Sequence, residues 1–285
     1  MAEEGVQRRP LLGVIGLGQV GTALKHVLEF YGDVVGYDAK STLPWKPILG
    51  TSVAFVCVQT PGSPGGRLDC GCVDQVLTRL EQDNYLGVVV VRSTLRVGYM
   101  DGARKRFPSL RLVYLPEFLR EKSRLQWSVN PDRVVIAGKD RDLRLVLSCF
   151  SWVEDAPVLR MSYREAELGK LAHNAFIATK VSFTNEVEQI SKEWGADPEL
   201  VMSVVTADRR VRSREHLHPG LGPYDGSCVP KDTRELVSVA KDPVLLRAVE
   251  EVNKKVIDRV LKASGQRDLP VVATAAARTV TEETK

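Results

Sequence analysis

A thiol, a cation and a carboxylate stand close together in the second half of the chain. Cys228, Lys231 and Asp232 fall within five residues of one another in the stretch Tyr224–Asp232, which its glycine predicts to be a flexible turn. A thiolate is the nucleophile in cysteine chemistry, and a neighbouring ammonium favours that charged form, while a carboxylate can act as a base or position a water. An ordinary turn with an incidental buried cysteine and a solvated Lys–Asp pair would contain the same residues.

A second group of residues has the spacing of a dinucleotide-binding turn. The apolar run Leu11–Ile15 predicts a buried strand that passes directly into Gly16–Gly21 and then into a helical pattern ending near Phe30. Such glycines permit a tight turn, the approach of a pyrophosphate to a helix N-terminus and close packing of helix on strand. The next predicted strand ends at Asp38, whose carboxylate can accept both ribose hydroxyls and would repel a 2′-phosphate. The sequence therefore predicts an NAD site that contains Gly16, Gly18, Gln19, Val20, Gly21 and Asp38.

Further apolar runs in the first half predict more strands of the same sheet. Ser52–Val58 is followed by Thr60 and Pro61, and Gly87–Val91 is followed by Thr94. Small polar residues at the carboxyl ends of strands are candidates for cofactor or substrate contacts, or are simple strand-end caps. Strands and helices alternate throughout this half, which predicts a Rossmann-type, doubly wound α/β domain over residues 1–160.

The second half has helical periodicity. Glu165–Trp194 contains no proline and carries apolar residues at helical spacing, so it predicts a helix of about 30 residues, or about 45 Å. Lys170 and Asn174 share one face of this helix, either as an exposed polar stripe or as a catalytic pair. Pro243–Ala263 predicts a second amphipathic helix. We expect an all-helical domain over residues 161–263 and a tail over 264–285 that is partly disordered.

Composition limits the classes of function. The formal net charge of +4 over 285 residues does not indicate a nucleic-acid partner. The 5 cysteines show no even, closely spaced framework, which favours a reducing compartment. Cys70 and Cys72 have no second ligand pair at metal spacing, so no metal site is predicted. No apolar run approaches the roughly 18 residues of a membrane span, and the N-terminus does not have the pattern of a leader, so we expect a cytoplasmic protein.

Taken in order, these motifs resemble those of the nucleotide-sugar 6-dehydrogenase family, which includes UDP-glucose and GDP-mannose 6-dehydrogenases. The resemblance is colinear from about Leu11 to Ala263. It is carried by the glycine-rich turn with Asp38 and by Val58–Pro61, Ser93–Thr94, Pro116–Glu121, Pro131–Val135, Lys170–Phe176, Asn185–Glu186, Gly195–Asp197 and Gly226–Asp232.

The resemblance implies oxidation of the C6 alcohol of a nucleotide sugar to a carboxylate, with two NAD per turnover and UDP-glucose as the default substrate. Cys228 would form a thiohemiacetal and then a thioester. Lys170 and Asn174 would hold the oxyanion or a water, and Asp232 would act with water in proton transfer. Glu117 would activate the water that hydrolyses the thioester, with Thr94 beside it.

The resemblance also implies contacts with bound molecules and a partner subunit. Besides the glycine-rich turn, the cofactor would contact Thr60, Pro61, Thr94 and Lys231. The sugar nucleotide would contact Glu117, Phe118, Leu119, Arg120, Glu121, Lys170, Asn174 and Gly226. Arg210 would reach the substrate of a partner subunit, which implies a homodimer formed through the helical domain.

Three departures from the family's pattern bear on activity. The segment between Asp38 and Val53 is shorter than usual, and Asp225 stands where the family usually has glycine, which puts a negative charge beside the thiolate. The chain also ends soon after Ala263, before the third domain that binds the nucleotide base in this family. A separate chain carrying that domain is therefore one expected partner.

Two rival interpretations stay open. A β-hydroxyacid dehydrogenase-like protein also joins a Rossmann domain to a long helix with a Lys and an Asn at this spacing, but it needs no cysteine and makes one NADH per substrate. Cys228 and Glu117 argue against it. A truncated or split homologue would bind NAD without turnover, and Asp225 and the short chain motivate that interpretation.

Overall fold

The computed structural model describes residues 10–63, 65–118, 129–153, 155–209, 211, 215–226 and 228–264. Two compact units make up the chain, unit 1 (Met1–Ala172) and unit 2 (His173–Lys285). The division falls inside the long helix α6 (Tyr163–Glu193), which contributes residues to both units. The domain boundary near residue 160 stays a prediction.

Unit 1 is built on a parallel sheet of five strands. These are β1 (Leu11–Ile15), β2 (Asp33–Tyr37), β3 (Val53–Val56), β4 (Val88–Val91) and β5 (Arg111–Tyr114). Their order is β2-β1-β3-β4-β5, with every neighbouring pair parallel. The direction of winding therefore reverses between β1 and β3, which is where doubly wound sheets bind their ligands, beyond the carboxyl ends of the strands. The predicted Rossmann-type sheet is confirmed.

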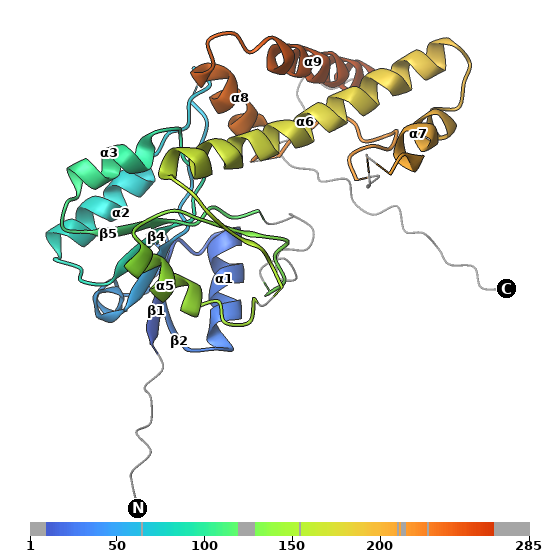
Figure 1. Cartoon of the computed structure of the whole chain (residues 1–285). Helices are drawn as coiled ribbons and strands as arrows, with labels where there is room; N and C mark the ends of the chain where they lie inside the picture. Colours follow the sequence, from blue (N-terminus) through green and yellow to red (C-terminus); the bar gives the residue numbers. More distant parts are fainter. Residues whose placement is uncertain are drawn as a thin grey trace, which may run out of the picture. The chain divides into compact units, whose positions relative to one another are not determined.

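Helices cover both faces of this sheet (Figure 1). The helices α1 (Gln19–Glu29) and α5 (Asp140–Ser148) lie on one face, and α2 (Gly71–Gln82) and α3 (Tyr99–Arg106) lie on the other. Both faces of β4 are buried because of this double cover, and all four of its residues are valine. Such uninterrupted apolar runs are typical of parallel strands between two helical layers.

Two connections in unit 1 depart from a simple alternation of strand and helix. The path from β2 to β3 contains only a short 3-10 helix, η1 (Lys46–Gly50), in agreement with the shortness of this segment in the sequence. The predicted strand at residues 133–138 is found as β6 (Val134–Ile136). It pairs with β7 (Val158–Arg160) in a separate sheet, and one antiparallel bridge between Tyr114 and Ala137 connects it to β5.

Unit 2 is helical over the residues that the structure describes. It comprises the rest of α6 together with α7 (Pro198–Ala207), α8 (Val229–Val239) and α9 (Val244–Ser264). Helix α9 lies beside α6 (Figure 1), where the hydroxyl of Ser182 donates to the carbonyl of Val249 at 3.2 Å. No helix of the described ranges has the length and apolar character needed to cross a bilayer.

Candidate active site

The turn between β1 and α1 has a backbone that requires glycine at two positions. Gly16 has a φ of +90°, in the left-handed region, and a Cβ on Gly21 would lie 1.9 Å from the carbonyl oxygen of Gly16. A Cβ on Gly18 would meet nothing within 4 Å, and no side chain caps the N-terminus of α1 at this residue. The first amides of α1, which follow Gly18, are therefore open to an anion, so this turn fits a pyrophosphate.

Asp38 follows β2 at the same edge of the sheet. Its carboxylate accepts the backbone N–H of Lys40 at 2.9 Å and that of Leu17 at 2.8 Å. These two donors lower the pKa of the Asp38 carboxyl, so that it is ionised at neutral pH. A fixed carboxylate beside the glycine-rich turn fits the ribose hydroxyls of an adenosine.

The other residues predicted to contact the cofactor from strand ends also lie at this edge. Thr60 and Thr94 are buried. The hydroxyl of Ser93 donates to the carbonyl of Val58 at 2.6 Å, which connects the segments that follow β3 and β4. Pro61 begins the next loop and its carbonyl accepts the N–H of Asp69.

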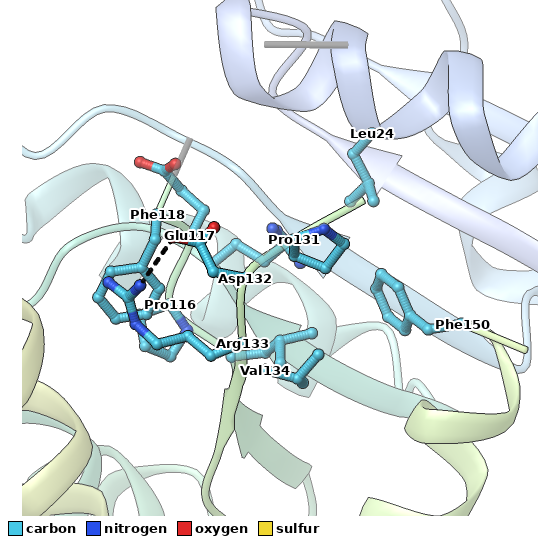
Figure 2. Close-up of a pocket in the computed structure, with 11 residues that line it drawn as sticks. Leu24, Pro116, Glu117, Phe118, Pro131, Asp132, Arg133, Val134 and Phe150 are labelled. Carbon is cyan, nitrogen blue, oxygen red and sulfur yellow. Dashed lines mark hydrogen bonds and ion pairs between the residues drawn. The ribbon is translucent and has the colours of Figure 1, made fainter. Parts of the chain in front are cut away.

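Lys170 forms a buried ion pair within unit 1. Its ammonium lies 3.8 Å from a carboxylate oxygen of Glu117, and Lys170 is only 4% exposed. The Phe118 ring lies near two cations: the Lys170 ammonium is 5.0 Å from its centre and the Arg133 guanidinium is 4.2 Å from it. Figure 2 shows Arg133 beside the Phe118 ring. This burial excludes the exposed polar stripe as an explanation of Lys170.

A pocket lies beside Glu117 and Phe118 (Figure 2). Its wall is partly charged and partly apolar, and consists of Leu24, Arg92, Leu115, Pro116, Glu117, Phe118, Pro131, Asp132, Arg133, Val134 and Phe150. Arg92 carries a charge into this wall, and burial lowers the pKa of its guanidinium. Sequence reasoning missed Arg92, although a charged residue directly after the four valines of β4 is a usable signal.

A second buried polar group lies in unit 2. The amide of Asn174 donates to the carboxylate of Asp232 at 2.5 Å, and the Lys231 ammonium donates to the other oxygen at 2.6 Å. Asp232 is 0% exposed and Asn174 is 6% exposed. Each charge is thus compensated, as burial requires. The interpretation of Lys231 and Asp232 as a solvated pair is therefore wrong.

Cys228 is the N-cap residue of α8. The helix begins at Val229 with Pro230 in its first turn, so Lys231 and Asp232 are helical instead of lying in the turn that the sequence predicts. Gly226, just before, has a φ of +82°. Asp225 is exposed.

Exposure distinguishes Cys228 from the other thiols. All 5 cysteines lie in the described part of the chain, and none forms a disulfide. Burial raises the pKa of Cys57 to about 12 and that of Cys149 to about 11, so both stay protonated. Cys70 is buried, Cys72 is half-buried and Cys228 is exposed. Cys228 is therefore the best candidate for a nucleophile.

Comparison with known proteins agrees with this arrangement. A model of the NAD-binding domain of the UDP-glucose/GDP-mannose dehydrogenase family matches residues 39–149, and a model of the central domain of that family matches residues 164–255. The GDP-mannose 6-dehydrogenase of Pseudomonas syringae is 30% identical over 316 aligned positions, which cover 92% of this chain and 72% of the relative.

The chain belongs to the UDP-glucose/GDP-mannose dehydrogenase family. Unit 1 includes its NAD-binding domain, and NAD is the cofactor. The UDP-glucose 6-dehydrogenase TuaD of Bacillus subtilis is 33% identical over 76% of this chain. A UDP-glucose dehydrogenase from Pyrobaculum islandicum has a similar structure, with a TM-score of 0.81 and 28% identity over 93% of this chain and 73% of that one.

The chain spans only part of the length of several family members. It covers 50% of TuaD and 54% of a UDP-glucose 6-dehydrogenase of Streptococcus pneumoniae. The separate chain with a third, nucleotide-binding domain stays a prediction.

Some of the residues predicted from the family resemblance lie outside the described residues. These are Leu119, Arg120, Glu121 and Arg210. The described site residues form two groups, in which Glu117 and Phe118 lie beside Lys170, and Asp232 and Lys231 lie beside Asn174. Lys170 and Asn174 stand one turn apart on α6.

Proposed function

We propose that the protein oxidises the C6 alcohol of a nucleotide sugar to a carboxylate in two NAD-dependent steps. The observation that carries the proposal is that Lys170 and Asn174, one turn apart on α6, are both buried and each contact a carboxylate from another part of the chain. Lys170 pairs with the half-buried Glu117, and Asn174 bonds to the buried Asp232. Burial of a charge or an amide costs free energy unless a partner compensates it, so a pair of such residues on one helix suits a reaction site better than a structural helix face. The default substrate is UDP-glucose, and GDP-mannose and UDP-N-acetylmannosamine are the other candidates.

The first step converts the alcohol to an aldehyde. Bound NAD supplies the chemistry of hydride acceptance from C6. The Lys170 ammonium stabilises the negative charge that develops on the sugar oxygen, and Asn174 donates a hydrogen bond to that oxygen or to a water. The hydroxyl proton leaves through a water next to Asp232.

Cys228 acts in the second step. Its thiolate adds to the aldehyde carbon, a carbon–sulfur bond forms and the carbonyl oxygen becomes the thiohemiacetal oxygen, again stabilised by Lys170. Loss of a second hydride from the same carbon, to a second NAD, oxidises the thiohemiacetal to a thioester, and the thiohemiacetal oxygen loses its proton. One difficult oxidation is thus divided into two steps of similar chemistry.

Hydrolysis returns the thiol and releases the acid. Glu117 takes a proton from a water that attacks the thioester carbon, with Thr94 as a further contact for that water. The carbon–sulfur bond breaks, the sulfur regains a proton and the sugar leaves as a carboxylate. The pairing of Glu117 with Lys170 at 3.8 Å and the place of Glu117 in the pocket wall support this assignment.

The remaining assignments concern binding. We propose that Gly16, Gly18, Gln19, Val20, Gly21, Asp38, Thr60, Pro61 and Lys231 contact NAD, and that Phe118 and Gly226 contact the sugar nucleotide. The assignments of Leu119, Arg120, Glu121 and Arg210 to the substrate rest on the family resemblance alone.

We also propose that the protein forms a homodimer through unit 2. Phe176, Phe183 and Ile190 are exposed on α6, and successive members are seven residues apart, so they form one apolar stripe. Leu200 and Val204 on α7 are exposed as well. Large apolar side chains in such a row are typical of a surface that a partner covers.

The test is NADH production by the purified protein with UDP-glucose, GDP-mannose and UDP-N-acetylmannosamine in turn. We expect two NADH per sugar from one of them, and arrest of the reaction in Cys228→Ser. One NADH per sugar, unaffected by Cys228→Ser, would favour a β-hydroxyacid dehydrogenase-like reaction. Binding of NAD with no NADH from any sugar would favour the non-catalytic or split homologue.

A further inference from the structure

The segment that leads to Cys228 is attached to two helices by side chains. On α6, the hydroxyl of Thr184 donates to the carbonyl of His216 at 3.0 Å, and the amide of Asn185 donates to the carbonyl of Gly222 at 2.8 Å. The Glu188 carboxylate accepts the N–H of Gly220 at 2.7 Å. We call residues 215–226 the nucleophile arm, because they end just before Cys228.

Asn253 of α9 makes the attachment that lies nearest to Cys228 among these. Its side-chain oxygen accepts the backbone N–H of Tyr224 at 2.8 Å, and its side-chain amide donates to the carbonyl of the same residue at 3.0 Å. Both bonds are buried. One side chain therefore fixes the donor and the acceptor of a single backbone residue, which defines the position and the orientation of that residue.

The surroundings of Tyr224 add apolar contacts to this pair of bonds. Its side chain belongs to a buried cluster with Ala178, Val181 and Val249. Gly226, which lies between Tyr224 and Cys228, has a φ of +82°, in the region that glycine adopts most readily. Among the attached residues of the arm, which include Gly220 and Gly222, Tyr224 is the one nearest to Cys228 in the sequence.

We propose that Asn253 is a positioning residue that holds Cys228 in place for the second oxidation. This inference rests on the proposed function. Asn253 acts through the backbone of Tyr224, which receives both of the side-chain hydrogen bonds found for Asn253 among the described residues. Its loss should therefore impair the step that needs the thiolate more than the step that precedes it. A misplacement of about 1 Å can lower a rate by about 100-fold.

The experiment compares the two oxidations in Asn253→Ala, Asn253→Asp and the wild type. The first oxidation is measured with the sugar that the wild type uses, in the presence of an alkoxyamine that traps the aldehyde. The second is measured with the corresponding 6-aldehyde supplied directly. We expect Asn253→Ala to slow the second oxidation by about 100-fold and the first by less than about threefold. Asn253→Asp keeps the acceptor for Tyr224 and should fall in between.

The matched control is Asp258→Ala, which removes an exposed polar side chain from the same helix and should alter neither rate. If Asn253→Ala slows both oxidations equally, the substitution has damaged the protein in general and the inference is overturned. The inference is also overturned if Asn253→Ala slows neither oxidation. A wild type that binds NAD but makes no NADH would instead overturn the proposed function, and the effect of Asn253 on the second oxidation with it.

A spin label on Cys228 tests whether Asn253 restricts the motion of this residue, and the test does not depend on enzyme activity. In a Cys72→Ser background, with the labelled site verified by mass spectrometry, we expect a nitroxide on Cys228 to be more mobile in Asn253→Ala than in the wild type or in Asp258→Ala. Equal mobility in all three would overturn the positioning role.

Discussion

Burial separates residues of the same type into different chemical classes in this protein. Burial raises the pKa of the Cys57 thiol to about 12, so this thiol stays protonated. Cys228, in contrast, is exposed at the N-cap of α8. A nucleophile must be ionised and reachable. Cysteine content alone could not distinguish the two, because burial depends on the packing of elements that are distant in the sequence.

Lys170→Met should remove most of the activity while it preserves cofactor binding. The ammonium is the charge that we assign to oxyanion stabilisation, and loss of one such donor costs about 100-fold or more in kcat, or roughly 3 kcal/mol. Methionine keeps most of the apolar stem. The measurement is kcat for NADH production with NAD affinity determined by calorimetry.

The control for Lys170→Met is Lys254→Met, which removes an exposed ammonium on α9. A decrease in kcat of less than about threefold in Lys170→Met would contradict its role, because it would fall far below the effect of an oxyanion donor.

Asp38→Ala should weaken NAD binding. The variant loses charged hydrogen bonds to the ribose, which contribute about 1.5–3 kcal/mol each, so we expect Kd to rise about tenfold or more. The two backbone donors that lower the Asp38 pKa keep the carboxylate ionised around neutral pH, so the wild-type affinity should change little between pH 6 and pH 8. Asp33→Ala, an exposed aspartate at the start of β2, should bind NAD as the wild type does.

At the scale of elements, the first turns of α6 are bonded firmly to unit 1. The Tyr163 hydroxyl donates to the carbonyl of Leu112 at 2.7 Å, and Arg164 pairs with Asp101 at 2.8 Å. The Glu167 carboxylate accepts the N–H groups of Gly98 and Met100, at 2.6 and 2.7 Å, where α3 begins. These bonds fix the helix that carries Lys170, three residues after Glu167.

Glu167→Gln should make stability less dependent on pH. Burial raises the Glu167 pKa to about 7, although the N–H groups of Met100 and Gly98 oppose the shift. The folded protein therefore holds this proton more tightly than the unfolded chain, so the contribution to stability is full below the unfolded pKa of about 4.5 and is lost as pH rises through about 7.

The size of this effect is at most about 3 kcal/mol, from 1.36 kcal/mol per pKa unit. Urea unfolding of unit 1 at pH 5, 6, 7 and 8 should show a smaller decrease in the free energy of unfolding for Glu167→Gln than for the wild type. Glu193→Gln changes an exposed carboxylate near the end of the same helix and should keep the wild-type slope. If the free energy of unfolding of Glu167→Gln decreases with pH as steeply as that of the wild type, the Glu167 carboxyl is not the source of this pH dependence.

Elements with a clear apolar pattern could be predicted from the sequence, whereas the start of α8 and the contacts between distant segments could not. The strands of the parallel sheet are marked by apolar runs and helix α6 by a long apolar periodicity. In the turn at Gly16–Gly21, the positive φ of Gly16 and the lack of room for a Cβ on Gly21 favour glycine. The start of α8 was missed, although Pro230 and Asp232 in its first turn are helix-start signals. Gly226 beside them favours a turn instead.

Individual bonds between distant residues could not be predicted from the sequence, although the family resemblance assigned Glu117 and Lys170 to one site. Glu117 and Lys170 are brought together by the packing of α6 on unit 1, and Asn253 reaches Tyr224 only because α9 lies beside α6. Periodicity reports which face of one element is apolar, but it does not report which partner that face will meet.

At the scale of the whole molecule, Phe183→Asp should convert the proposed dimer to a monomer. Phe183 is the middle residue of the exposed stripe with Phe176 and Ile190, and a carboxylate buried there would lack a partner, which costs several kcal/mol per ion. Sedimentation velocity measures the change. Leu86→Asp replaces another large apolar side chain, which is 84% exposed in unit 1, and it should leave the mass of the sedimenting particle unchanged. If Phe183→Asp sediments as the wild-type dimer does, the α6 stripe is not the interface. A wild type that sediments as a monomer would refute the dimer itself, and because the proposed role of Arg210 depends on a partner subunit, that role would have to be abandoned as well.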